Sequence, residues 1–215
     1  MADQTRLELF IDVLDKKQQR AMAQAGLKPS ELIEAIIQEF REIDYLSSTP
    51  ADYRLIKATD RAPLDDDRPL GRQLTNQAAL ILAPIAPPLP AGARPPSKDV
   101  YLREEATDTV YKLHWLPAII GRPDGTQGQN DLIAVNLSQH EQGLRVSRRH
   151  AQISEENGQL FIQSLSPNTT TITDRQGASK TLDGNKQPLH PGDTIVLDAS
   201  QISLKLIVRE QEGGG

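Results

Sequence analysis

The sequence contains no cysteine, and it contains no long apolar run. Without cysteine the protein has no disulfide, no thiolate zinc site and no cysteine nucleophile, which fits a reducing compartment. No apolar run approaches the roughly 18 residues that a membrane-spanning helix needs. The N-terminus MADQTRLELF lacks the basic and then apolar pattern of a signal peptide. We therefore expect a cytoplasmic protein without membrane insertion.

An excess of positive charge is also missing. The 215 residues include 24 Lys and Arg against 29 Asp and Glu, which gives a formal net charge of -5. A chain with this balance has no overall attraction for nucleic acid, so we expect no nucleic acid partner, and any basic site must be local. The four histidines are scattered without the spacing of metal ligands, so the sequence predicts no metal site and no cofactor.

A proline-rich segment divides the chain. The stretch PIAPPLPAGARPPS, residues 84–97, contains six prolines, which favour extended polyproline II over packed structure. We predict a semi-rigid linker at 85–99 between domains at 1–84 and 100–210, and a flexible tail at 211–215. A ligand for a proline-recognising domain is the alternative interpretation of the linker.

The segment before the linker has the patterns of a mixed α and β fold. RLELFIDVL alternates between apolar and polar residues, as a half-buried strand does, and RAMAQA predicts a weaker second strand. KPSELIEAIIQEFREIDYL changes to helical spacing, with Ser30 placed to cap the helix. DYRLIKA and AALILAP predict two more short strands around a turn-rich segment.

The order strand, strand, helix, strand, loop, strand resembles the β-grasp. The words LELFIDV, LKPSELIEAI, PLDDDRPLGRQL and AALIL resemble ubiquitin over about 75 residues, and they are also similar to the small ubiquitin-like proteins of bacterial type VII secretion loci. The resemblance implies an α+β domain that binds another protein. It does not imply conjugation, because no di-glycine follows ALILAPIAPP.

The segment after the linker has all-β patterns. Strand candidates occur in VYLREEATDTVYKLHWLPAIIGR, LIAVNL, HAQISEE, QLFIQSL, TTITD, DTIVLD and ISLKLIV. Strands this short, separated by turns this frequent, predict a sandwich rather than a βαβ sheet.

Positive charge gathers in one stretch of this all-β segment. GLRVSRRHAQIS, residues 143–154, holds three arginines beside a serine and a histidine; Arg122 ends the strand AIIGR, and Asn168 stands in the loop SPNTTT. We expect these loops to lie at one end of the sandwich, offering guanidinium, hydroxyl and amide donors with no acidic residue among them. Such a donor set suits a dianion such as a phosphate ester.

Four short motifs of this segment occur in the order that is typical of forkhead-associated (FHA) domains. They are IIGR at 119–122, VSRRHAQI at 146–153, SPNTTT at 166–171 and LHPGDTIVL at 189–197. The segment therefore resembles the FHA family, whose members are sandwiches of eleven strands that bind phosphothreonine. The two resemblances together imply two domains, an α+β ubiquitin-like β-grasp followed by an all-β FHA sandwich of about eleven strands.

The FHA resemblance implies five phosphopeptide-binding residues by their positions in these words. Arg122 matches an arginine that contacts the phosphate or the adjoining backbone, and Ser147 matches the serine whose hydroxyl binds phosphate. Arg148 stands where a second phosphate donor is common, and Asn168 matches the asparagine that holds the peptide main chain. Arg145 lies where some members read the third residue after the phosphothreonine.

Three further positions, two that support the site and one that contacts the peptide, complete the set. His150 matches a histidine that buttresses it, and Gly121 is most simply a turn residue that supports it. Thr169, which we count among the peptide-binding residues, stands where the family usually has glycine, so the loop conformation that glycine allows is in question. No third residue orients His150 against Ser147 and no nucleophile-elbow pattern surrounds the serine, so we predict no catalytic residue and no enzyme.

These features predict a non-enzymatic signalling adaptor. Its expected partners are a phosphothreonine-containing protein, either a Ser/Thr kinase or its substrate, and a second protein that binds the ubiquitin-like domain. The alternative is a structural component of a type VII-like secretion assembly or a division assembly, with a degenerate phosphopeptide site. A third hypothesis is self-recognition, in which Thr49 or Thr107 is phosphorylated and bound by another copy.

Overall fold

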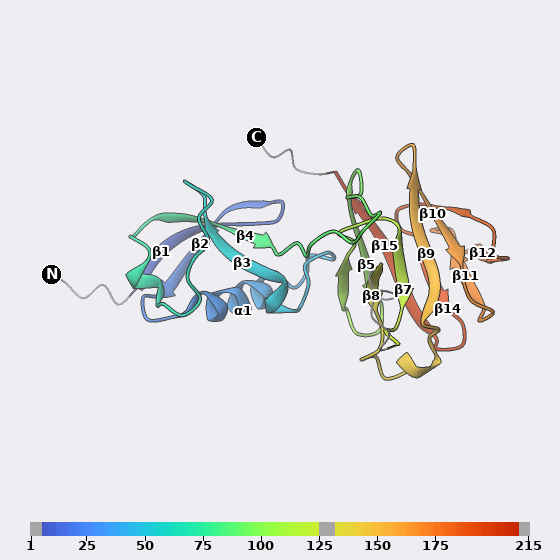
Figure 1. Ribbon diagram of the computed structural model, residues 1–215. Helices are drawn as coiled ribbons and strands as arrows, with labels where there is room; N and C mark the ends of the chain where they lie inside the picture. Colours follow the sequence, from blue (N-terminus) through green and yellow to red (C-terminus); the bar gives the residue numbers. More distant parts are fainter. Residues whose placement is uncertain (1–5, 125–131, 211–215) are drawn as a thin grey trace. The chain divides into compact units, whose positions relative to one another are not determined.

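The computed structural model describes residues 6–124 and 132–210, so the predicted tail at 211–215 lies outside the described residues. The chain divides into two compact units, Met1–Ala86 and Pro87–Gly215 (Figure 1). Within the described ranges, no helix has the length and apolar character needed to cross a bilayer.

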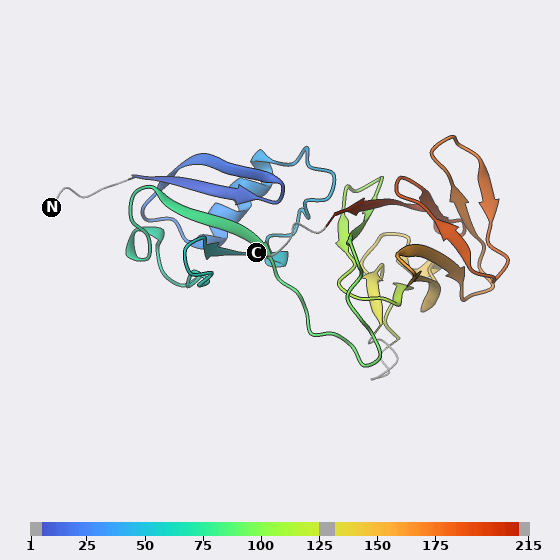
Figure 2. The same ribbon diagram turned by 90° about the horizontal axis from the view of Figure 1, so that it is seen from above.

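The first unit is a four-stranded sheet with one α-helix against one face (Figures 1 and 2). In the sheet the order is β2-β1-β4-β3, with β1 parallel to β4 and the other pairs antiparallel. The predicted order of strand, strand, helix, strand and strand is confirmed. Its elements are β1 (Arg6–Val13), β2 (Lys16–Gln24), α1 (Pro29–Glu39), η1 (Pro50–Asp52), β3 (Tyr53–Lys57), η2 (Leu70–Arg72) and β4 (Ala78–Pro84).

The core of this unit follows from the apolar pattern of its sequence. Alternate residues of β1 point to the same face of the sheet, and these are its buried apolar residues. The apolar stripe of α1 is buried against that face. The two elements contribute to the apolar core Leu7, Leu9, Ile11 and Val13 of β1 and Leu32, Ile33, Ile36 and Ile37 of α1.

Helix α1 begins and ends differently from the sequence prediction. Lys28 rather than Ser30 occupies the capping position, because Pro29 has a fixed φ that suits the first turn. The Lys28 backbone N–H donates to the Glu31 carboxylate at 2.7 Å. The helix ends at Glu39. The apolar spacing continues to Leu46 because Ile43 and Leu46, which lie in turns after the helix, are also buried in the core.

The second unit is a sandwich of two sheets around its own apolar core (Figure 2). One sheet has the order β13-β10-β9-β7-β8 and the other β12-β11-β14-β15-β5-β6. The prediction of an all-β sandwich of about eleven strands is confirmed for the described part of this unit. Its elements are β5 (Asp99–Glu104), β6 (Val110–Lys112), β7 (Ala118–Gly121), β8 (Ile133–Asn136), η3 (Gly143–Arg145), β9 (Arg149–Glu156), β10 (Gln159–Ser164), β11 (Thr170–Thr173), β12 (Ser179–Thr181), β13 (Gln187–Leu189), β14 (Thr194–Leu197) and β15 (Ile202–Arg209).

The end of the predicted linker is attached to the sandwich. The Arg94 backbone exchanges hydrogen bonds of 3.0 and 2.8 Å with Leu116. Its guanidinium contacts the buried Glu155 carboxylate at 2.7 Å, and Ser97 also donates to that carboxylate. Only the part of segment 85–99 that precedes Arg94 is therefore available as a spacer.

Candidate functional site

The strand register brings three loops to one end of the sandwich. Gly121, the last residue of β7, pairs with Arg149, the first residue of β9. Ser164, the last residue of β10, pairs with Ala151 near that same start of β9. The loops after β7, before β9 and after β10 therefore meet, and they carry the residues that the sequence predicts to bind phosphopeptide.

Gly121 is required by a close approach of two backbone segments. A Cβ atom at this position would lie 2.1 Å from the Arg148 carbonyl oxygen and 3.1 Å from that of Ser147. The next residue, Arg122, donates its backbone N–H to the same Arg148 carbonyl at 3.2 Å. The φ of Gly121 is not in the left-handed region, so packing rather than a turn accounts for the glycine.

The half-buried Arg122 side chain is held by the second loop. Its Nε donates to the carbonyl oxygen of the buried Val146 at 2.8 Å. This bond fixes the orientation of the planar Arg122 guanidinium. Its acceptor, Val146, directly precedes Ser147 in the sequence. The end of β7 and the segment before β9 are thus tied together by both backbone and side-chain contacts.

Ser147 and Asn168 meet from different loops. The Asn168 Nδ2 donates to the Ser147 Oγ at 3.0 Å, and the Asn168 backbone N–H donates to Ser166 Oγ at 3.2 Å. Because the amide fills an acceptor site of the hydroxyl, Ser147 keeps its own proton to donate to an anion. The two predicted side chains are therefore oriented together, 21 residues apart in the sequence.

His150 is completely buried beneath this pair. Its Nδ1 accepts the Ser147 backbone N–H at 3.3 Å, which places the ring proton on Nε2. Burial lowers the pKa of His150, and the Thr169 carbonyl and the Asp198 carboxylate offset this in part. The Thr169 contact is weak, because Nε2 finds no partner of hydrogen-bond geometry among the described residues. The ring contacts the serine backbone rather than its hydroxyl, so it is not placed as a general base for Ser147.

Arg148 contradicts one sequence expectation, because an acidic residue lies beside it. The Arg148 side chain is 64% exposed, and its guanidinium lies 3.9 Å from the carboxylate of Asp124, which is 9% exposed. The prediction that these loops contain no acidic residue is therefore wrong. Asp124 follows Arg122 by two residues in the loop after β7, and this proximity to a strand end was the signal available in the sequence. Arg145, the last residue of η3, is exposed.

Thr169 stands where the FHA resemblance predicts glycine, and its backbone is not left-handed. It is not among the described residues with positive φ, so the threonine side chain causes no backbone strain there. Its carbonyl accepts the Asp198 backbone N–H at 3.2 Å, and Asp198 also accepts the Thr171 hydroxyl at 3.0 Å. The loop after β10 is thus supported by the turn that follows β14.

Two further residues brace the second loop, and the sequence analysis did not find them. His140 Nε2 contacts the buried Glu104 carboxylate of β5 at 3.1 Å. No local pattern signals this pair, which is 36 residues apart in the sequence. In the described ranges, no group of three or more His, Asp or Glu side chains is placed to hold a metal ion.

Comparisons with known proteins give one family and a set of solved structures. Residues 118–198 match the model of the FHA domain. No curated protein matched the sequence. None of these comparisons indicates a catalytic family.

The solved structures that resemble the chain include several FHA domains. The FHA domain of human APLF in complex with an XRCC1 bisphospho peptide is 22% identical, covers 51% of this chain and 97% of its own, and has a TM-score of 0.36. Mycobacterium tuberculosis EmbR in complex with a low affinity phosphopeptide is 21% identical over 54% of this chain and 26% of its own, with a TM-score of 0.40. The FhaA FHA domain complexed with the intracellular domain of Rv3910 is 28% identical over 51% and 99%, with a TM-score of 0.34.

Proposed function

We propose that the second unit, whose residues 118–198 match the FHA domain model, binds protein segments that contain phosphothreonine. The observation that carries this proposal is the Ser147–Asn168 hydrogen bond, which joins a hydroxyl and an amide from two of the three loops that meet at this end of the sandwich. Arg122 and Arg148 lie on these loops too. The three loops offer guanidinium, hydroxyl and amide groups, which donate the hydrogen bonds that a phosphate dianion accepts. Gly121 and His150 act as support, and Arg145 and Thr169 contact the flanking peptide.

The donor set also sets the expected strength of binding. Charge-assisted hydrogen bonds contribute about 1.5 to 3 kcal/mol each, whereas association costs roughly 4 to 15 kcal/mol. Three or four such bonds therefore do not bind tightly alone, and neighbouring peptide residues must add to them. We expect a micromolar, reversible reader of a Ser/Thr kinase or of its substrate.

The first unit is, in this proposal, a ubiquitin-like β-grasp domain that binds a second protein. Its strand order β2-β1-β4-β3, its parallel β1–β4 pair and its single helix support that assignment. The whole chain then acts as a non-enzymatic adaptor that joins a phosphorylated protein to another partner.

Titration of the full chain with paired phosphothreonine and unphosphorylated peptides tests the phosphopeptide site. The wild type should bind only the phosphorylated member, and Ser147→Ala should weaken binding about 10- to 100-fold, as the loss of a charge-assisted hydrogen bond predicts. Arg122→Ala should weaken it further, by about 2 to 5 kcal/mol. Arg175→Ala is the matched control, because Arg175 is exposed beyond the far end of β11.

Equal affinities for the two peptides would refute phosphothreonine recognition. Capture of a partner that survives phosphatase treatment and the Arg122→Ala change would instead favour a structural component of a secretion or division assembly. Thermal unfolding of each variant shows whether a loss of binding comes from a loss of fold.

A further inference from the structure

Leu144 is the most exposed large apolar side chain among the described residues, at 86% of its full surface. It lies in η3, three residues before Ser147, in the loop that carries the proposed phosphate donors. A single exposed leucine is common on protein surfaces and is not itself a site. Leu144 differs from other exposed leucines in two ways: its backbone is tightly packed, and it lies close in sequence to the proposed site.

The backbone on both sides of Leu144 is packed tightly. A Cβ atom on Gly143 would lie 2.1 Å from the Leu137 carbonyl oxygen, so the turn is pressed against the segment before it. The Gly143 N–H donates to the His140 carbonyl at 2.8 Å, and the N–H of the buried Val146 donates to the Gly143 carbonyl at 3.0 Å. The exposed side chain therefore projects from a fixed turn.

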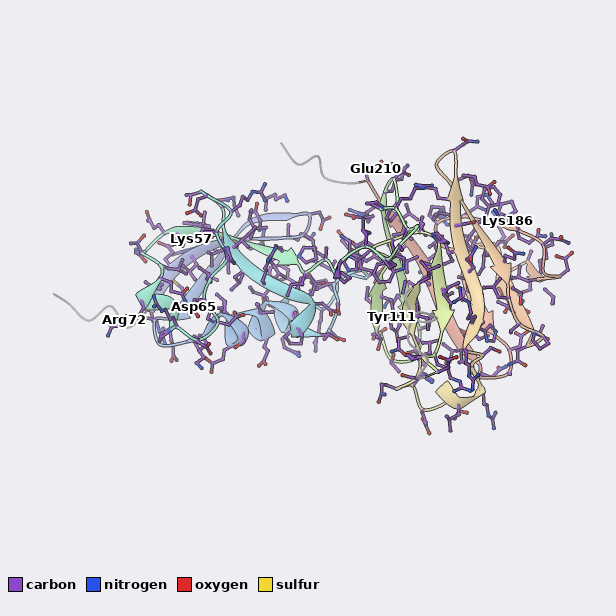
Figure 3. All side chains as sticks on the ribbon, viewed as in Figure 1. Lys57, Asp65, Arg72, Tyr111, Lys186 and Glu210 are labelled. Atoms are coloured by element: carbon purple, nitrogen blue, oxygen red, sulfur yellow. The ribbon has the colours of Figure 1, made fainter. Side chains whose placement is uncertain are left out.

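A buried hydrogen-bonded pair, His140 and Glu104, braces this turn against the other sheet of the sandwich. His140 accepts the Gln142 backbone N–H through Nδ1 at 2.9 Å and contacts Glu104 through Nε2. Glu104 ends β5 and its side chain is 2% exposed. Tyr111 lies on the neighbouring β6 (Figure 3). Burial and the Glu104 carboxylate raise the pKa of Tyr111 to about 12. The loop before β9 is thus anchored on the core rather than free to collapse over its leucine.

An apolar side chain held on a fixed backbone contributes to binding without the entropic cost of ordering a loop. Three residues of chain span at most about 10 Å. If a phosphothreonine binds at Ser147, the peptide residues next to it therefore lie within reach of Leu144. Leu165, another exposed leucine at this end of the sandwich, is tied to the site because its N–H donates to the His150 carbonyl at 2.9 Å.

We propose that Leu144 is a specificity-determining contact, and that the preferred phosphothreonine segments carry an aliphatic or aromatic residue within about three positions of the phosphothreonine. This inference rests on the proposed function. The apolar side chain of the ligand covers the leucine, while its phosphate occupies the donors of the three loops.

Phosphothreonine peptides with leucine or serine at each flanking position, titrated against the full chain, test the proposal. The wild type should prefer leucine at one flanking position by about tenfold, as partial burial of a leucine side chain predicts. Leu144→Ser should lose this preference but keep its dependence on the phosphate, and Leu144→Met should retain both. Met22→Ser is the matched control, because Met22 is an exposed apolar residue of the other unit.

The possible results separate this inference from the proposed function. Phosphate-dependent binding with no flanking preference, or with a preference that Leu144→Ser leaves unchanged, would overturn the role of Leu144 alone. Binding of the wild type that does not depend on the phosphate would overturn both. Because Leu144 is exposed, we expect equal melting temperatures for the wild type and Leu144→Ser.

Discussion

The two units differ in what they bury. In both, apolar side chains fill the core between the layers. Among the described residues of the first unit, Ser47 is the one buried polar side chain. The described part of the sandwich buries Glu104, His150, Thr170, Asp193 and Ser200.

The buried polar groups of the sandwich fix its loops. His150 accepts from the backbone of Ser147, and Glu104 holds His140. Asp193 accepts the backbone N–H of His190 at 2.7 Å. Burying a polar group is unfavourable unless hydrogen bonds offset the loss of hydration. The sandwich bears that cost where loops must keep one conformation, and the predicted binding residues lie on loops of this kind.

Of the substitutions that test this difference between the two units, Gly121→Ala should have the largest effect on stability and on phosphopeptide binding. The added Cβ would meet the Arg148 carbonyl at 2.1 Å, so β7 and the segment before β9 would have to separate. We expect a loss of about 3 kcal/mol or more in the unfolding free energy of the sandwich, together with a loss of phosphopeptide binding. Urea unfolding followed by the fluorescence of Trp115, the single tryptophan, reports on this unit.

Gly26→Ala in the first unit is the matched change. No atom lies within 4 Å of the Cβ it would add, and its φ is not in the left-handed region. We expect a change of about 0.5 kcal/mol or less, measured by amide hydrogen exchange in the first unit. Equal effects of the two substitutions would show that close backbone packing does not distinguish the site-bearing unit.

The regular elements of both units could be predicted because they carry local patterns. The alternation of β1 and the helical spacing of α1 are properties of neighbouring residues, and the apolar strands of the sandwich are equally visible. Strand β12 (Ser179–Thr181) escaped prediction because all three of its residues are exposed at a sheet edge. Strand β13 is not among the strand candidates, because its residues form part of a polar, proline-containing stretch.

The candidate site shows the same division between local and distant information. The motifs around Arg122, Ser147 and Asn168 predict these residues as donors, but the motifs do not include Asp124, which lies 3.9 Å from Arg148. The contact of Glu104 with His140 likewise depends on the pairing of distant strands. The sequence therefore predicts candidate donors, but not the carboxylates of Asp124 and Glu104 that contact Arg148 and His140.

Replacing His150 should give the next largest effect. It also tests whether the stability of the sandwich, unlike that of the first unit, depends on pH. Replacing His150 with glutamine removes the buried acceptor for the Ser147 N–H, which should cost about 1 to 3 kcal/mol. Its pKa is lowered in the folded state, so the unfolded chain takes up the proton first as the pH falls. Its contribution to stability is therefore complete above about pH 6.5 and decreases below that value until the folded-state pKa is reached.

Urea unfolding at a series of pH values checks this direction. The wild-type sandwich should lose stability as the pH falls from about 7.5 to about 5.5, and His150→Gln should lose less over the same range. The first unit, residues 1–86, contains no histidine and serves as the internal control. An unchanged pH dependence in His150→Gln would contradict a neutral, buried imidazole.

The smallest effect we expect is a gain of affinity, from Asp124→Asn. The Asp124 carboxylate lies 3.9 Å from the Arg148 guanidinium, so in the proposed site it would repel the phosphate and compete with it for Arg148. An ion pair with one exposed partner contributes about 0.2 to 1 kcal/mol, so phosphopeptide binding should tighten about two- to fivefold. Asp67→Asn makes the same change of charge in the first unit and should leave affinity unchanged. Weaker binding by Asp124→Asn, measured by the same titration, would mean that this carboxylate positions Arg148 for the ligand. Asp124 would then belong with Glu104 among the acidic groups that hold the loops of the sandwich.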